Sequence, residues 1–150
     1  MAKYLLDTNI LIGLFDDSST MENKEKARNI LTEKLREEGS LFFVTELIRY
    51  EVLRGVMWDD CDKLQKLKKH LASFPVLEIN KEVGDIARNL WRYDKANHPD
   101  AGKKFEKYRF DAFHIATAKA YDLQLLSIDT DIAKIDRLYQ KMQQAYSPLP

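Results

Sequence analysis

Four short apolar segments alternate with stretches of helical spacing, and this alternation is the feature that most constrains the fold of the chain. Residues 41–44 (LFFV) form a continuous apolar run, which is typical of a strand buried on both faces of a parallel sheet. Residues 4–6, 75–79 and 123–128 are the other strand candidates. Because strands separated by helices form parallel sheets with helices on both faces, the sequence predicts a three-layer α/β/α fold with a central, mainly parallel sheet.

Apolar stripes and capping residues mark the helices expected between these strands. Stripes at helical spacing run through residues 27–35, 47–55 and 83–91, and residues 63–74 and 109–121 are also expected to be helical. Several polar residues stand at expected N-caps: Asp7 or Thr8, Ser19 with Glu22 three residues later, Thr45 and Asn80. No repeat or linker-like segment divides the chain, so one domain is expected over residues 1–150.

Composition narrows the class of protein. The chain carries 24 basic and 24 acidic residues, so it lacks the general positive charge of proteins that coat polyanions, and any contact with nucleic acid must be local. A single cysteine, Cys61, excludes an internal disulfide framework and fits a reducing cytosol. The longest apolar run, residues 10–15, is far shorter than the roughly 20 residues that cross a bilayer, so we expect a cytoplasmic protein with no membrane contact.

Four acidic residues stand out from the charges expected to face solvent. Asp7 and Asp129 each follow a predicted strand, and the carboxyl ends of parallel strands share the sheet edge where open α/β folds bind ligands. Glu51 lies on the apolar stripe of its helix, where an ionised group needs a partner to offset its lost hydration. Asp111 opens an alanine-rich helix, with His114 on the same face. Taken singly, Asp7 and Asp129 are also open to a plain role as cap or turn residues, and Asp111 to one as a helix-start acid.

Together, these acids predict a metal-dependent reaction. If the carboxylates met within about 5 Å, each pair would repel by roughly 3 kcal/mol at an effective dielectric near 20, so the site would take up protons or hold a cation. An oxygen-only ligand set favours Mg²⁺ or Mn²⁺ over Zn²⁺. Such an ion activates water and neutralises charge on phosphate oxygens, which makes a phosphodiester-cleaving nuclease the expected function.

Four segments resemble the motifs of PIN-domain ribonucleases, in the order of that family and over essentially the whole chain. Residues 4–12 (YLLDTNILI) resemble the first motif and residues 51–55 (EVLRG) the second. Residues 110–118 (FDAFHIATA) resemble the third and residues 125–132 (LLSIDTDI) the fourth. A small PIN domain of this kind is similar to the VapC toxins of toxin–antitoxin modules.

The resemblance implies an endoribonuclease that hydrolyses RNA with one or two Mg²⁺ or Mn²⁺ ions. Asp7, Glu51 and Asp111 would bind the metal, directly or through water, and Asp129 would complete the acidic pocket. It further implies a homodimer and a small cognate antitoxin that inserts a peptide at the active site, often with an arginine that pairs with the acids.

The resemblance also assigns supporting roles around this pocket. Asn9 and Ser127 would support the acids, and Asp131 competes with Asp129 for the fourth position.

A basic segment precedes the third motif. Lys103, Lys104, Lys107 and Arg109 are expected either to form a lip beside Asp111 that contacts RNA phosphates or to belong to a solvated loop.

Two other functions compete with the nuclease. One is a catalytically silent PIN-fold module that binds RNA or protein, and the intact acidic set argues against it. The other is a phosphatase that forms an aspartyl-phosphate on Asp7. Asn9 argues against this second function, because it stands where haloacid-dehalogenase-type enzymes carry a second acid.

Overall fold

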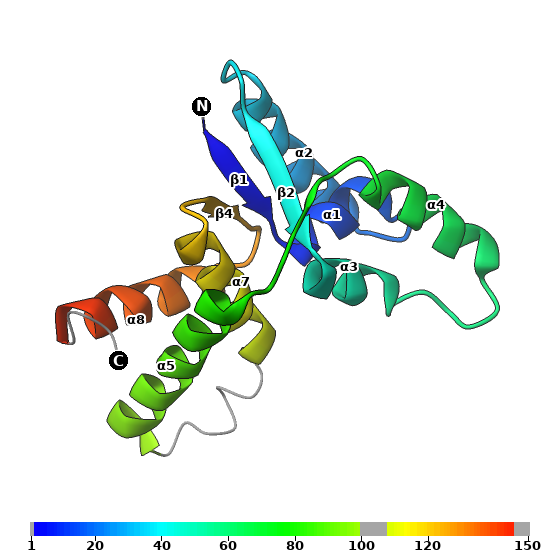
Figure 1. The fold of residues 1–150 in the computed structure, drawn as a ribbon. Helices are drawn as coiled ribbons and strands as arrows, with labels where there is room; N and C mark the ends of the chain where they lie inside the picture. Colours follow the sequence, from blue (N-terminus) through cyan, green and yellow to red (C-terminus); the bar gives the residue numbers. More distant parts are fainter. Residues whose placement is uncertain (1, 100–107, 146–150) are drawn as a thin grey trace. The chain divides into compact units, whose positions relative to one another are not determined.

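A computed structural model describes residues 2–99 and 108–145. Within these residues the chain forms one sheet of four strands, in the order β3-β2-β1-β4, and every neighbouring pair is parallel (Figure 1). The expected parallel sheet is therefore confirmed. The strands are β1 (Lys3–Leu6), β2 (Leu41–Thr45), β3 (Val76–Leu77) and β4 (Gln124–Leu126).

Seven helices accompany the sheet in the described part of the chain. They are α1 (Thr8–Phe15), α2 (Met21–Leu35), α3 (Glu46–Leu53), α4 (Cys61–Leu71), α5 (Lys81–Asn97), α7 (Arg109–Ala120) and α8 (Asp131–Ala145). None of these helices is long and apolar enough to cross a membrane.

The contacts divide the chain into two compact units. Unit 1 comprises Met1–Glu78 and Leu123–Ile128 and contains the whole sheet with α1 to α4. Unit 2 comprises Ile79–Asp122 and Asp129–Pro150 and contains α5, α7 and α8. One domain over residues 1–150 stays a prediction.

Burial along β2 differs from the sequence expectation. Only Val44 and Thr45 are fully buried, whereas Leu41 is exposed and Phe42 and Phe43 are half-buried. The two buried residues are the ones that pair with β3, whereas residues 41–43 pair with β1. The apolar run therefore predicted the strand but not the exposure of its first half.

Most helix starts follow the expected capping residues. Asp7 caps α1 and accepts a hydrogen bond from the Thr8 backbone at 2.7 Å, while Thr45 and Asn80 cap α3 and α5. The capping box at Ser19 is wrong by one residue, since Thr20 caps α2 by accepting from Asn23 N at 3.2 Å. Two further boundaries differ: α4 begins two residues earlier than expected, at Cys61 after its N-cap Asp60, and β3 and β4 are shorter than the apolar runs that predicted them.

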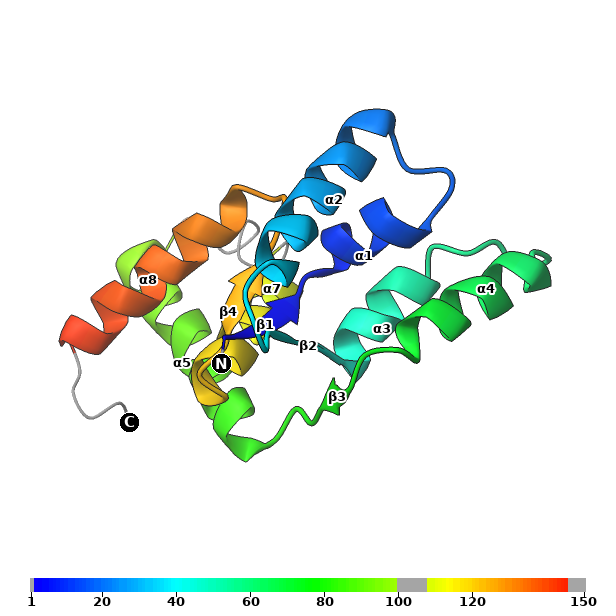
Figure 2. The same ribbon diagram turned by 90° about the horizontal axis from the view of Figure 1, so that it is seen from above.

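Helices α1 and α2 of unit 1 pack side by side, as both ribbon views show (Figures 1 and 2). Their contact depends on Gly13, because a Cβ at this position would lie 2.7 Å from Ala27 Cβ and 2.9 Å from the Asn23 carbonyl oxygen. Neither atom belongs to a flexible side chain that can swing away. The hydrogen atom in place of a side chain therefore sets the distance between the two helices.

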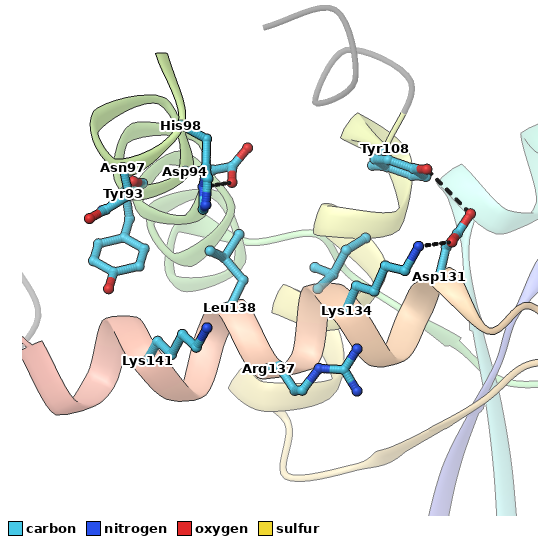
Figure 3. A pocket seen from close by; sticks show the side chains of 11 residues that line it. Tyr93, Asp94, Asn97, His98, Tyr108, Asp131, Lys134, Arg137, Leu138 and Lys141 are labelled. Atoms are coloured by element: carbon cyan, nitrogen blue, oxygen red, sulfur yellow. Dashed lines mark hydrogen bonds and ion pairs between the residues drawn. The ribbon is translucent and has the colours of Figure 1, made fainter. Parts of the chain in front are cut away.

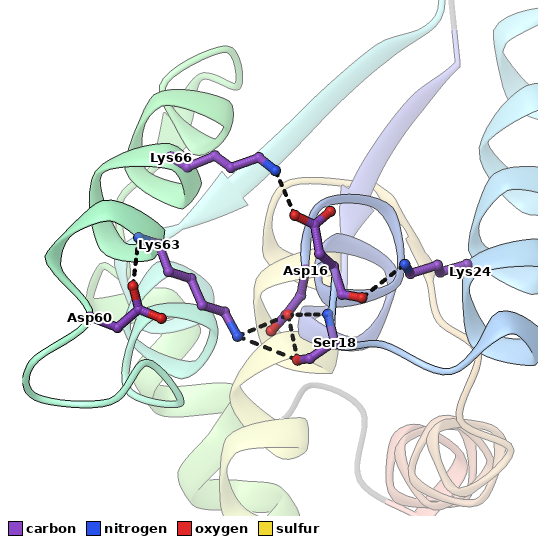
Figure 4. Close-up of polar contacts among 7 residues, drawn as sticks. Asp16, Ser18, Lys24, Asp60, Lys63 and Lys66 are labelled. Atoms are coloured by element: carbon purple, nitrogen blue, oxygen red, sulfur yellow. Dashed lines mark hydrogen bonds and ion pairs between the residues drawn. The ribbon is translucent and has the colours of Figure 1, made fainter.

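Ion pairs connect α4 to the segment that follows α1 (Figure 4). Lys63 Nζ lies 3.0 Å from Asp16 Oδ1, and Lys66 Nζ lies 2.7 Å from Asp17 Oδ2. Desolvation by burial raises the pKa of Asp16, but hydrogen bonds from Ser18 and Lys63 outweigh it and lower the pKa from its ordinary value of 3.8. Next to these pairs, Phe15 stacks on His70 with ring centroids 4.5 Å apart.

Three helices form the core of unit 2. Val83 and Ala87 of α5 pack with Ala116 of α7, and the small residues of α7 allow this close approach. Helix α8 buries Ile132, Ile135, Tyr139 and Met142 along one face, and Lys119 Nζ lies 2.8 Å from Asp136 Oδ1, which joins α7 to α8.

We expect Gly13→Ala to lower the free energy of unfolding by about 1–3 kcal/mol, because the added methyl group overpacks the α1–α2 contact. Gly84→Ala is the matched control, since a Cβ there meets no atom within 4 Å and alanine favours the helical backbone of α5. We expect this control to gain about 0.5–1 kcal/mol. Urea denaturation measures the free energy of unfolding of both variants. A Gly13→Ala protein as stable as the parent would contradict the packing described.

We expect Lys63→Met to lower the free energy of unfolding at pH 7 by about 1 kcal/mol, because it removes the partner of a largely buried carboxylate. A depressed pKa of Asp16 stabilises the fold above pH 3.8, and this contribution disappears as the pH falls below that value. The difference between the two proteins should therefore shrink over the same range in urea titrations at several pH values. Lys69→Met, an exposed α4 position, should show no such pH dependence.

Candidate functional site

Asp7 is a buried carboxylate at the carboxyl end of β1, with 4% of its surface exposed. Its backbone N–H donates to the Leu126 carbonyl of β4 at 3.0 Å, which places the residue at the sheet edge. Oδ1 accepts from Thr8 N at 2.7 Å, and Oδ2 accepts from the Ser127 hydroxyl at 2.7 Å and from Asn9 Nδ2 at 3.3 Å. These donors fix the orientation of the carboxylate.

Asn9 and Ser127 form a small network around Asp7. Asn9 Nδ2 donates to Ser127 Oγ at 2.9 Å, and Asn9 Oδ1 accepts from the Ile128 backbone N–H at 3.0 Å. The amide thus joins the start of α1 to the end of β4. Both residues expected to support the acidic site lie in direct contact with Asp7, and their part in function stays a prediction.

Glu51 lies on α3 of the same unit, and 12% of its side chain is exposed. The expected burial of this acid is thus found. Arg54 follows one turn later, with its Nη2 atom 4.0 Å from Glu51 Oε2. At this distance the guanidinium offsets part of the cost of placing a carboxylate on the apolar side of the helix.

Unit 2 carries the third expected acid, Asp111, in the first turn of α7, where the helix dipole favours a negative charge. Asp111 is half-buried, and His114 is buried one turn further along the helix. Arg109 is exposed, and its guanidinium lies 5.2 Å from the centre of the Phe110 ring.

The other three members of the expected basic lip, Lys103, Lys104 and Lys107, lie outside the described residues.

The two candidates for the fourth acid have different surroundings. Asp129 is exposed, and its Oδ1 accepts from the Asp131 backbone N–H at 2.8 Å, at the start of α8. Asp131 lies 3.2 Å from Lys134 Nζ through Oδ1 and accepts from the Tyr108 hydroxyl at 3.3 Å through Oδ2 (Figure 3). A cation and a phenol thus engage both oxygens of Asp131, a pairing that the sequence pattern did not indicate.

The expected site residues fall into two groups. Asp7, Asn9 and Ser127 contact one another within unit 1, which also contains Glu51. Asp111 and Asp129 belong to unit 2. Convergence of all four acids stays a prediction, because it joins residues of different units.

Comparison with known families identifies the class of this protein. The PIN domain model matches residues 4–138, a stretch that includes all four motifs. A search of curated proteins finds no match. PIN domains are usually nucleases that act on RNA and generally use divalent metals. Together with the parallel sheet, the match confirms the fold class expected from the sequence. The chain belongs to the PIN domain family.

Proposed function

We propose that this protein is a metal-dependent endoribonuclease that hydrolyses RNA phosphodiester bonds. The observation that carries the proposal is the carboxylate of Asp7, which is buried at the sheet edge and hydrogen-bonded at both oxygens. A carboxylate that is oriented in this way is prepared to bind a cation, because its oxygens are already held in place.

The donor types fit a hard divalent cation. Asp7, Asp111 and His114 each offer one atom that can bind a metal, and we propose that Asp7, Glu51, Asp111 and Asp129 supply the carboxylate oxygens that Mg²⁺ or Mn²⁺ prefers. When bound, the ion supplies Lewis acidity that activates water and neutralises charge on the phosphodiester.

The residues of the chain then divide into ligands and positioning groups. Asp7 is held in one orientation by the Ser127 hydroxyl and the Asn9 amide, so these two act as positioning residues. We propose Asp129 as the fourth acid, because Lys134 and Tyr108 already engage both oxygens of Asp131. Arg109 and the lysines Lys103, Lys104 and Lys107 are proposed to contact RNA phosphates.

The proposal extends to the biological role. The motifs resemble those of VapC toxins, and on that basis we propose a homodimeric toxin that a small antitoxin inhibits by placing a peptide with an arginine against the acids. Growth arrest on expression of the protein, lost with Asp7→Asn and relieved by a co-expressed partner, would support this role.

We expect purified protein to cleave RNA with Mg²⁺ or Mn²⁺ and to stop when a chelator is added. Asp7→Asn and Asp111→Asn should each lower the rate by about 1000-fold or more, a loss of roughly 4 kcal/mol of transition-state stabilisation. The melting temperature of Asp111→Asn should stay near that of the parent or rise, because a like charge is removed from the proposed site.

Asp59→Asn, an exposed acid outside the proposed set, should cleave at the parent rate. Cleavage that persists in both site variants, or that continues in chelator, would overturn the proposed function.

We expect Ser127→Ala to weaken Mn²⁺ binding by about 10-fold, because Asp7 Oδ2 loses its shortest hydrogen bond and the carboxylate is free to turn. Calorimetric titration with Mn²⁺ alone measures this affinity without any RNA cleavage. Ser73→Ala, an exposed position after α4, is the matched control. An unchanged affinity in Ser127→Ala would show that the hydroxyl does not position a metal ligand.

A further inference from the structure

A pocket of about 590 Å³ lies within unit 2, between α5, the start of α7 and α8 (Figure 3). We propose that this pocket binds a nucleotide of a single-stranded RNA segment, with cations of α8 on the phosphates and a tyrosine ring against a base. The inference rests on the proposed function, since it names a place where the RNA substrate is held.

The charges of the pocket are not balanced. Lys134, Arg137 and Lys141 follow one another along one face of α8, and all three line the pocket. Among the described residues, Arg137 and Lys141 form no ion pair, whereas Lys134 is paired with Asp131 at 3.2 Å.

The acids of the pocket are engaged locally. Asp94 lies 3.2 Å from His98 Nδ1, and Asp131 contacts Lys134 and Tyr108. Neither acid is paired with Arg137 or Lys141, so these two cations remain available to an anionic ligand.

Two tyrosines border this row of cations. In Figure 3, Tyr93 of α5 lies toward the Lys141 end, and Tyr108 lies toward the Asp131 end. Cations that follow a backbone, next to aromatic rings on which bases stack, are the combination that proteins use for single-stranded nucleic acid. A volume of about 590 Å³ also lies within the range of small-ligand pockets and can admit a nucleotide. An acidic peptide would use the cations but would gain nothing from stacking.

The pocket is lined by residues that are close in the chain to the proposed acids of the same unit. Asp131, which lines the pocket, follows Asp129 by two residues, and Tyr108 is the N-cap of α7, one turn before Asp111. An RNA strand held on α8 would therefore run beside the acids of unit 2. Binding there would contribute to affinity for the substrate and leave the proposed metal ligands untouched.

The test measures binding of a fluorescent single-stranded RNA to the full chain in chelator, so that no cleavage is needed. We expect the double variant Arg137→Gln, Lys141→Gln to raise the Kd by about 10-fold or more. The slope of log K against log salt should fall in magnitude by about 1.4, since each of two lost phosphate contacts on a single strand accounts for about 0.7. The control is Lys68→Gln, Lys69→Gln on α4, which removes the same charge from exposed positions and should change neither quantity.

A second pair of variants tests stacking separately from charge. Tyr93→Leu should raise the Kd for RNA several-fold, and Tyr93→Phe should restore it, because phenylalanine keeps the ring. An unchanged Kd and salt slope in the double variant would overturn the proposal. It would also be overturned if a polyglutamate peptide bound as tightly as RNA with no effect of Tyr93→Leu, since the pocket would then take an acidic peptide.

The outcomes separate the pocket from the proposed activity. RNA binding that depends on Arg137, Lys141 and Tyr93, in a protein that never cleaves, would overturn the nuclease and keep the pocket. Metal-dependent cleavage with the same KM in the parent and the double variant would overturn the pocket and keep the nuclease.

Discussion

The carboxylate of Asp7 holds together the parts of the structure on which the proposed function depends. The backbone N–H of Asp7 continues the hydrogen bonding between β1 and β4, and Oδ1 of its side chain caps α1. Oδ2 accepts a hydrogen bond from the hydroxyl of Ser127 at the end of β4. One side chain therefore ends a strand, starts a helix and connects two strands that are more than 100 residues apart in the chain. Burying a carboxylate is costly, and hydrogen bonds from three donors offset part of that cost.

The parallel sheet explains why Asp7 and Ser127 meet at the edge formed by the carboxyl ends of the strands. Parallel strands all end on the same side, so residues that follow β1 and β4 become neighbours without any local sequence signal that links them. Asn9 completes the connection by accepting from the Ile128 backbone and donating to Ser127. In unit 2 the acids lie at the starts of helices. Asp111 lies in the first turn of α7, and Asp129 accepts a hydrogen bond from the backbone N–H of the first residue of α8. Both units thus present acids at element ends, where backbone N–H groups stabilise negative charge.

How much of the fold and of the site could be predicted depended on how far apart in the sequence the interacting residues lie. The caps Thr45 and Asn80 were predicted correctly and Asp7 was one of two candidates for α1, because each bonds to a backbone N–H within three residues. The cap of α2 was predicted one residue too early, at Ser19, since a sequence pattern does not reveal which of two adjacent hydroxyl residues takes the extended backbone of the cap. Burial of β2 was overestimated, because burial depends on which distant segments cover a strand, and an apolar run does not indicate this. The contact of Asp131 with Tyr108 was missed for the same reason, since Tyr108 is 23 residues away.

The sequence by itself determined the family, the alternation of strands and helices and the identity of the acids, because these depend on residue type, periodicity and short motifs. Tertiary structure decided the surroundings of those acids. It buried Asp7, placed the Ser127 hydroxyl against its carboxylate, brought Tyr108 to Asp131 and left Arg137 and Lys141 without acidic partners among the described residues. Solvation and pairing of a charge are set by the atoms packed around it, and most of those atoms come from segments that are distant in the chain.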